Sequence, residues 1–249
     1  MRINQGDIFE IEATRWMVVD DFHNASERYD SVHCAPISVS QECRLPLDVS
    51  LSLEGGQEAA FIPQSQQARW VGVGAGPGGA YAALGLMKKL PKSLLTGPFA
   101  TAHPAVITRI KENLTTWFAL YTMFDLSGSS PRPLAEEPPS MHPGTILRTK
   151  RGAVCVVDHW GCLNEYPLLY VAPVQPDVTD LCPLDIEITS QFQDLFAKRN
   201  FVRVDDFFLV DREEIQSASS PPVVILGHGL LHKISRAFIL KFGHKGLLL

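Results

Sequence analysis

GDIFEIEATRWMVVDDF, residues 6–22, contains two short runs of apolar, aromatic and β-branched residues separated by a polar break. The runs are Asp7–Ile11 and Trp16–Val19, and four residues lie between them. Such a pattern predicts a β-hairpin. The chain therefore opens with antiparallel β-structure.

The same pattern returns at GTILRTKRGAVCVVDHW, residues 144–160, at a shift of 138. A second block, residues 30–52, aligns with residues 167–189 at a shift of 137. Ten of the 40 aligned positions are identical, whereas average composition gives about two to three by chance. The identities predict an internal duplication, and they are Gly6/Gly144, Ile8/Ile146, Val18/Val156, Val19/Val157, Asp20/Asp158, Ala35/Ala172, Pro36/Pro173, Pro46/Pro183, Leu47/Leu184 and Asp48/Asp185.

Each half reads as several short strands followed by a helix. Apolar residues at helical spacing predict helices over His103–Phe118 and Leu230–Phe242. Shorter helices are predicted over residues 80–90 and 191–200. The predicted fold class is mainly β with α (α+β), as two small twisted β-sheets or barrels each closed by a C-terminal helix.

A Pro-rich stretch separates the halves. Five prolines fall within residues 131–143, and proline removes backbone donors and fixes φ. Residues 127–143 therefore read as a stiff linker. The predicted domains are residues 1–126, with a Gly-rich insertion, and residues 144–249.

Composition limits the class of protein. Of 249 residues, 45% are hydrophobic and 20% charged, which excludes wholesale disorder. A formal charge of -5 excludes binding to nucleic acid by bulk charge, though not by a local basic patch. No apolar run approaches the ~20 residues of a membrane span, and no signal-peptide core follows the N-terminus, so a cytoplasmic location with no membrane partner is expected.

Cysteine and histidine spacing gives no metal prediction. The five cysteines do not form CxxC pairs, which argues against a disulfide framework or a structural zinc site. His228 and His232 are four apart, but no glutamate completes an HExxH arrangement, and packing or capping roles are favoured. Gly74–Gly79 satisfies GxGxxG without the acidic residue that a dinucleotide site needs, so a loop is favoured. No metal and no cofactor are predicted.

The order of motifs resembles the PemK/MazF (Kid-like) toxin family. The resemblance rests on Gly6-Asp7-Ile8, on Met17-Val18-Val19-Asp20 and on Pro36-Ile37-Ser38, with second copies at residues 144–146, 155–158 and 173–175. A late Val204–Asp211 segment adds to it. The resemblance implies a β-barrel that cleaves single-stranded RNA within a toxin–antitoxin pair, here as a one-chain pseudo-dimer.

The resemblance also implies site residues. Arg15 would stabilise charge at the phosphate, Ser38 would orient the phosphate, and His23 would shuttle the proton. Lys88, Lys89 and Arg109 form a predicted nucleic-acid-binding patch, and a second basic group lies near the C-terminus at Lys198, Arg199, Arg236, Lys241 and Lys245.

A second hypothesis is a non-catalytic module that keeps the barrel and binds a protein, either antitoxin-like or an assembly partner. Three features favour it: the tight turn after the first strand, Phe208 where the family has an arginine, and the acidic charge. Fold alone does not decide between the two hypotheses, because function lies in the site.

Overall fold

The computed structural model describes residues 3–22, 29–40, 42, 44–51, 60–62, 69–70, 79–119, 141–176, 178–189, 199–216 and 224–243. Backbone contacts group the chain into two compact units. Unit 1 is formed by Met1–Leu114 together with Leu240–Leu247, and unit 2 by Thr115–Ile239. The predicted linker, residues 127–143, lies largely outside the described part, and the domain boundaries that it sets stay a prediction.

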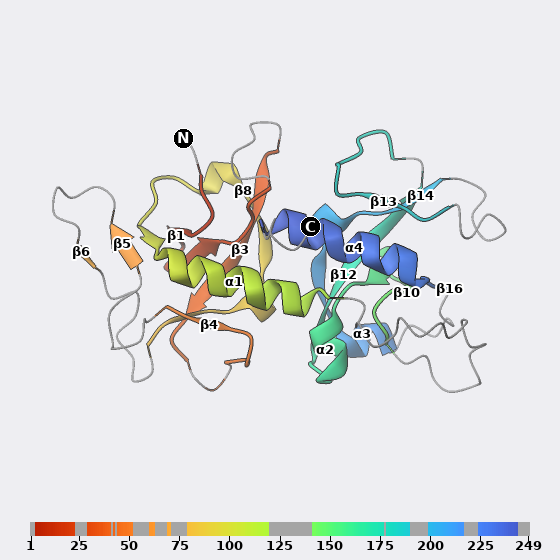
Figure 1. Cartoon of the computed structure of the whole chain (residues 1–249), viewed down its shortest axis with the longest axis horizontal. Coiled ribbons are helices and arrows are strands. Elements are labelled where there is room, and N and C mark those ends of the chain that lie inside the picture. Colours follow the sequence, from red (N-terminus) through yellow and green to blue (C-terminus); the bar gives the residue numbers. More distant parts are fainter. Residues whose placement is uncertain are drawn as a thin grey trace. The chain divides into compact units, whose positions relative to one another are not determined.

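Unit 1 contains a curled antiparallel sheet, of nine strands within the part of the chain that the structure describes. The strand order is β4-β7-β3-β2-β1-β9-β5-β6, and β8 also pairs with β3. The elements (Figure 1) are β1 (Asp7–Ile11), β2 (Thr14–Val18), β3 (Ser31–Ser38), β4 (Val49–Ser50), β5 (Ala60–Ile62), β6 (Arg69–Trp70), β7 (Tyr81–Ala82), β8 (Lys88–Pro91), β9 (Ala100–Ala102) and the start of α1 (Pro104–Trp117).

Unit 2 repeats this arrangement with a second curled sheet, of seven strands among its described residues. Its order is β13-β14-β12-β11-β10-β16, and β15 pairs with β12. The elements are β10 (Thr145–Thr149), β11 (Gly152–Val156), α2 (His159–Leu163), β12 (Leu168–Pro176), β13 (Ile186–Glu187), β14 (Asn200–Val202), β15 (Phe208–Asp211), α3 (Arg212–Gln216), β16 (Val224–Ile225) and most of α4 (His228–Lys241).

The strand pairings of the two units correspond. β1–β2–β3 matches β10–β11–β12, and the pairing of β3 with β7 and β8 matches that of β12 with β14 and β15. The predicted α+β class, with two curled sheets and a C-terminal helix, is confirmed. The repeated topology agrees with the duplication that the sequence alignment predicts.

Apolar clusters fill the inside of each curled sheet. In unit 1 the cluster is Ile3, Phe9, Val18, Val32, Cys34 and Leu95. In unit 2 it is Leu147, Val154, Val156, Leu169, Val171, Val210 and Ile215. Alternation along the strands turns their other side chains to the opposite face of each sheet.

Gly6 and Gly144, one of the identical pairs, lie where each helix packs closely on its sheet. Both have positive φ, +88° and +83°. A Cβ atom at Gly6 would meet the side chain of Ile107 at 2.6 Å, and one at Gly144 would overlap that of Leu231. Glycine is therefore required twice for the same reason, a left-handed backbone under a helix.

The predicted first hairpin forms, but its turn is tighter than expected. β2 begins at Thr14, so only Glu12 and Ala13 lie between the strands, with Ile11 opposite Thr14. Both turn residues have positive φ, 48° and 63°. Two left-handed residues in a two-residue loop are typical of a type I′ turn, which normally uses Asn-Gly.

Replacing Ala13 with glycine should stabilise unit 1. A side chain in the left-handed region costs about 1–2 kcal/mol, which glycine would remove from the folded state. Glycine also makes the unfolded chain more flexible, and this offsets part of the stabilisation. We expect the free energy of unfolding to rise by about 0.5–1 kcal/mol in urea titrations. Ala105→Gly, in the first turn of α1, is the matched control and should lower it. A lower stability of Ala13→Gly would contradict this turn geometry.

The predicted helix over residues 80–90 is wrong. The segment forms β7, a 3₁₀ turn at Leu84–Leu86, and β8. Its alanines and leucines favour a helix locally, but β7 pairs with β3 and β4, and β8 pairs with β3. Sheet pairing and burial therefore override local preference. The predicted helix over residues 191–200 lies almost wholly outside the described residues.

The two long helices each take part in both units. Their predicted positions are close to the observed Pro104–Trp117 and His228–Lys241. The end of α1, from Thr115, belongs to unit 2, and the end of α4, from Leu240, belongs to unit 1. Each unit therefore contains a helix end from the other half of the sequence.

Candidate functional site

Of the catalytic residues predicted in unit 1, Arg15 and Ser38 do not come together. Arg15 lies in β2, with Nε 3.4 Å from Glu10 Oε2 and its guanidinium 4.3 Å from the Phe99 ring centroid. Ser38 ends β3, and its Oγ accepts a hydrogen bond from the Ser40 N–H. Trp16 lies opposite Pro36, so alternation turns Arg15 and Ser38 to opposite faces of the sheet. His23 lies outside the described residues, and the catalytic roles stay a prediction.

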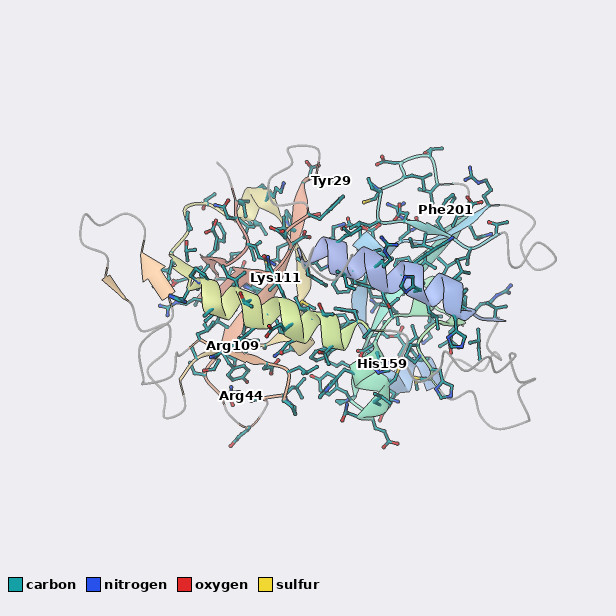
Figure 2. The ribbon with its side chains drawn as sticks, viewed as in Figure 1. Tyr29, Arg44, Arg109, Lys111, His159 and Phe201 are labelled. Atoms are coloured by element: carbon teal, nitrogen blue, oxygen red, sulfur yellow. The ribbon has the colours of Figure 1, made fainter. Side chains whose placement is uncertain are left out.

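The predicted nucleic-acid-binding residues are divided between two elements. Lys88 and Lys89 are neighbours in β8, so their side chains point to opposite faces of the sheet. Lys88 Nζ lies 5.9 Å from the Trp16 ring centroid. Arg109 is half-buried on α1, where Figure 2 labels it. The three cations therefore do not form a single sheet face.

A polar cluster around Arg203 lies in unit 2, directly after the end of β14. Arg203 Nε is 3.1 Å from Asp185 Oδ2, and Nη2 is 3.2 Å from Asp206 Oδ2. Nη1 donates to Gln175 Oε1 at 3.4 Å. The Arg203 side chain is 16% exposed, and that of Asp206 is 35% exposed. A cation held on three sides, yet still reached by solvent, is suited to contact an anionic group.

Local structure places each member of this cluster. Gln175 is in β12 opposite Phe201 of β14, which Figure 2 labels. The Arg203 N–H then donates to the Pro173 carbonyl, which fixes the backbone beyond the strand end. Asp185 follows a turn in which the Cys182 N–H donates to Asp185 Oδ2 at 2.8 Å. These backbone contacts fix the positions of the cluster's members.

Asp185 is the buried carboxylate of the cluster. Its side chain is fully buried, and burial raises the pKa of its carboxyl; hydrogen bonding to Cys182 and the charge of Arg203 oppose the rise. Among the described residues, Oδ1 of Asp185 has no hydrogen-bond partner, and neither does Nε–H of Arg203 in good geometry. Asp185 therefore anchors Arg203 from the buried side, whereas Asp206 is the carboxylate of the cluster that solvent reaches.

The equivalent place in unit 1 differs in the partners of its carboxylate. Asp48 corresponds to Asp185, and its Oδ2 accepts from the Leu45 N–H in the same type of turn. Its Oδ1, however, accepts from the Leu84 N–H at 2.8 Å. Ala83 stands where unit 2 has Arg203, since both N–H groups donate to the matching proline carbonyls, Pro36 and Pro173. Asp48 is therefore a satisfied structural carboxylate.

Sequence reasoning missed Arg203 and Asp185 as site residues. Asp185 appeared only as an identity between the repeats, and Arg203 directly precedes the Val204–Asp211 segment. The available signal was a basic residue followed by Asp205 and Asp206 between two apolar strands. That signal does not reveal Asp185 or Gln175 as neighbours, because strand pairing brings them there.

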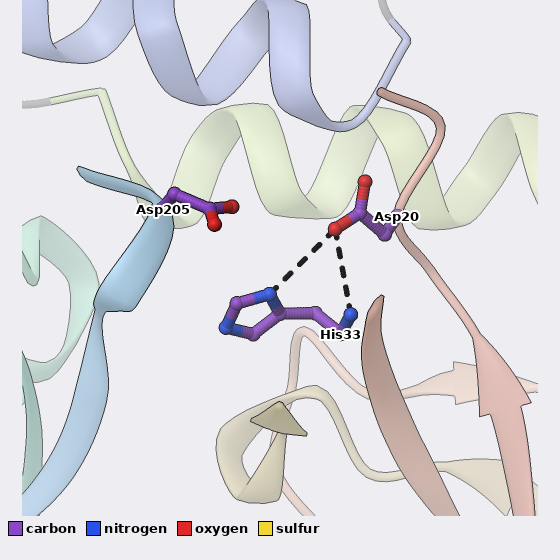
Figure 3. A group of neighbouring side chains, drawn as sticks. All are labelled: Asp20, His33 and Asp205. Atoms are coloured by element: carbon purple, nitrogen blue, oxygen red, sulfur yellow. Dashed lines mark hydrogen bonds and ion pairs between the residues drawn. The ribbon is translucent and has the colours of Figure 1, made fainter. Parts of the chain in front are cut away.

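A buried ion pair lies elsewhere, in unit 1. Lys241 Nζ is 2.7 Å from Asp20 Oδ2, and both side chains are fully buried. Figure 3 shows His33 beside Asp20, with Nδ1 3.7 Å and the backbone N 3.4 Å from Oδ2. Lys241 is therefore part of the core and cannot belong to the basic surface group that the sequence predicts near the C-terminus. Two other members of that group, Lys198 and Lys245, lie outside the described residues.

The second copy of Asp20 is Asp158 in unit 2, where the lysine is replaced by a tryptophan. Asp158 Oδ1 accepts from the Gly161 N–H at 2.5 Å, and Oδ2 accepts from the Tyr170 N–H at 3.0 Å. The Trp117 indole lies close enough to lower the pKa of Asp158, although its N–H is outside normal hydrogen-bond geometry. Burial dominates and raises this pKa to about 6. Asp20 and Asp158 are therefore structural carboxylates, each held by partners inside its own unit.

Comparisons with known proteins found no family model and no curated protein that matches the chain. Among the residues that are described, no helix has the length and apolar character to cross a membrane. The structure itself gives the fold class, two curled half-barrel sheets in one chain. The Arg203 cluster is the candidate site.

Proposed function

We propose that this chain binds single-stranded RNA through unit 2 and cleaves it at the Arg203 cluster. The observation that carries the proposal is the pairing of Arg203, which solvent reaches, with the carboxylate of Asp206, which is 35% exposed and lies 3.2 Å from Nη2. Phosphodiester cleavage needs those two groups, a cation at the phosphate and a proton acceptor at the attacking hydroxyl.

The chemistry follows from the two side chains. Arg203 would donate to a non-bridging phosphate oxygen, whose negative charge grows in the transition state. Asp206, the carboxylate of the cluster that solvent reaches, would take the proton of the ribose 2′-hydroxyl as the 2′-oxygen bonds to phosphorus. The bond from phosphorus to the 5′-oxygen breaks and water protonates that oxygen; the hydroxide that remains takes the proton from Asp206. The products are a 2′,3′-cyclic phosphate and a 5′-hydroxyl. Gln175 and the buried Asp185 would hold the guanidinium in place.

A cleavage assay with matched arginine variants tests the proposal. Arg203→Ala should lower the rate on a labelled mixed-sequence RNA by about 10²–10³, the usual cost of removing one charge-stabilising donor. Arg151→Ala is the control, because Arg151 is also a unit 2 arginine paired with a carboxylate, Glu214, at 3.9 Å. It should leave the rate within about threefold.

Binding is measured in parallel to separate the alternatives. Cleavage by wild type that Arg203→Ala leaves unchanged would contradict the proposed site. Binding without cleavage would leave an RNA-binding role and overturn the catalytic one. Neither binding nor cleavage would favour the non-catalytic protein-interaction module.

A further inference from the structure

The part of α4 in unit 2 has an exposed face made of basic and imidazole side chains. His228, His232, Lys233 and Arg236 are exposed. His228, His232 and Arg236 follow one another at intervals of four, and Lys233 lies three residues before Arg236, so they share one side of the helix. The other side is buried and consists of Leu230, Leu231, Ile234, Ser235, Ala237 and Phe238. None of the 14 residues of α4, which Figure 1 draws in blue, is acidic.

This face contrasts with the charge of the unit that carries it. Unit 2 contains 15 acidic and 10 basic residues, whereas unit 1 contains 12 of each. Within the described part of the chain, neither Lys233 nor Arg236 has an ion-pair or hydrogen-bond partner. Two cations and no carboxylate on a helix of an acidic unit form a local electropositive surface.

We propose that the exposed face of α4, defined by His228, His232, Lys233 and Arg236, binds the phosphate backbone of single-stranded RNA. The inference rests on the proposed function and adds a binding surface to the Arg203 cluster. Every side chain on this face can donate hydrogen bonds to phosphate, and arginine can do so in bidentate fashion.

An RNA strand fits this face better than a protein partner does. Protein interfaces concentrate their binding energy in buried aromatic and aliphatic anchors. The exposed positions between His228 and Arg236 include no aliphatic side chain. Backbone binding needs only cations and donors, and it carries no sequence preference.

The test uses the full chain and a labelled 2′-O-methyl oligouridine, which has no free 2′-hydroxyl and so is not cleaved. Lys233→Glu/Arg236→Glu should weaken binding at least tenfold at low salt. Its plot of log affinity against log salt should lose about 1.4 in slope, about 0.7 for each lost cation. Arg148→Glu/Lys150→Glu, an equally exposed basic pair of unit 2, is the control and should bind nearly as wild type does.

Equal affinity of wild type and the α4 double variant would overturn the inference, and so would an equal loss in the control pair. Tighter binding of a polyglutamate peptide than of the oligonucleotide, lost in the α4 variant, would assign the face to an acidic protein and also overturn it. Binding that depends on α4, with no cleavage of unmodified RNA, would support this inference while contradicting the catalytic proposal. Cleavage that depends on Arg203 but not on α4 would do the reverse.

Discussion

Replacing Lys241 with methionine should lower the free energy of unfolding by about 3–5 kcal/mol, the usual cost of leaving one member of a buried ion pair alone. The ammonium lies 2.7 Å from Asp20, and neither side chain is exposed. The loss is large beside a typical total stability of about 5–15 kcal/mol. Urea unfolding followed by circular dichroism measures it.

Two further variants make the Lys241 prediction specific. Lys233→Met removes an exposed lysine from the same helix and should change stability by less than about 0.5 kcal/mol. Asp20→Asn/Lys241→Met removes both charges and should recover much of the loss, because no unpaired charge is left buried. If Lys241→Met matches Lys233→Met, the ion pair does not stabilise unit 1.

Asp158 should make stability fall as pH rises. Its pKa is about 6 in the folded chain against 3.8 for the free side chain. Between these two values the folded state therefore binds more protons than the unfolded state, so the free energy of unfolding decreases with increasing pH. About two pKa units correspond to about 3 kcal/mol, lost between about pH 4 and pH 7.

The Asp158 contribution is isolated by comparison with Asp158→Asn, which cannot titrate there. The stability of wild type minus that of Asp158→Asn should fall by about 3 kcal/mol from pH 4 to pH 7.5. Asp180→Asn, an exposed unit 2 aspartate, is the control and should follow the wild-type curve. A constant difference between wild type and Asp158→Asn would contradict the burial effect.

The strands and long helices follow from local patterns, and the sequence predicts them well. Val18, Val19, Val156 and Val157 lie in apolar runs that form strands wherever they can pair. The helix prediction for the segment around Ala82 and Ala83 was wrong because the strands with which it pairs, β3 and β4, are 30 residues or more away in the sequence. Local propensity contains no information about such pairing.

The candidate site was harder to predict, for the same reason. Asp185 and Arg203 are 18 residues apart, and Gln175 is 28 residues before Arg203. Lys241 reads as a solvated helix lysine until its partner, 221 residues away, is known. A sequence shows which residues are charged. Whether a charged side chain binds a ligand, takes part in catalysis or stabilises the fold depends on its burial and its neighbours, which the sequence does not show.

The most direct test of the account uses a DNA oligonucleotide that contains one ribonucleotide. Because the proposed reaction needs a 2′-hydroxyl, wild type should cut once, on the 3′ side of the ribose, and leave a 2′,3′-cyclic phosphate. Arg203→Ala should cut it at least about 10² more slowly. An intact oligonucleotide, or cleavage at deoxyribose positions, would contradict RNA cleavage at the Arg203 cluster.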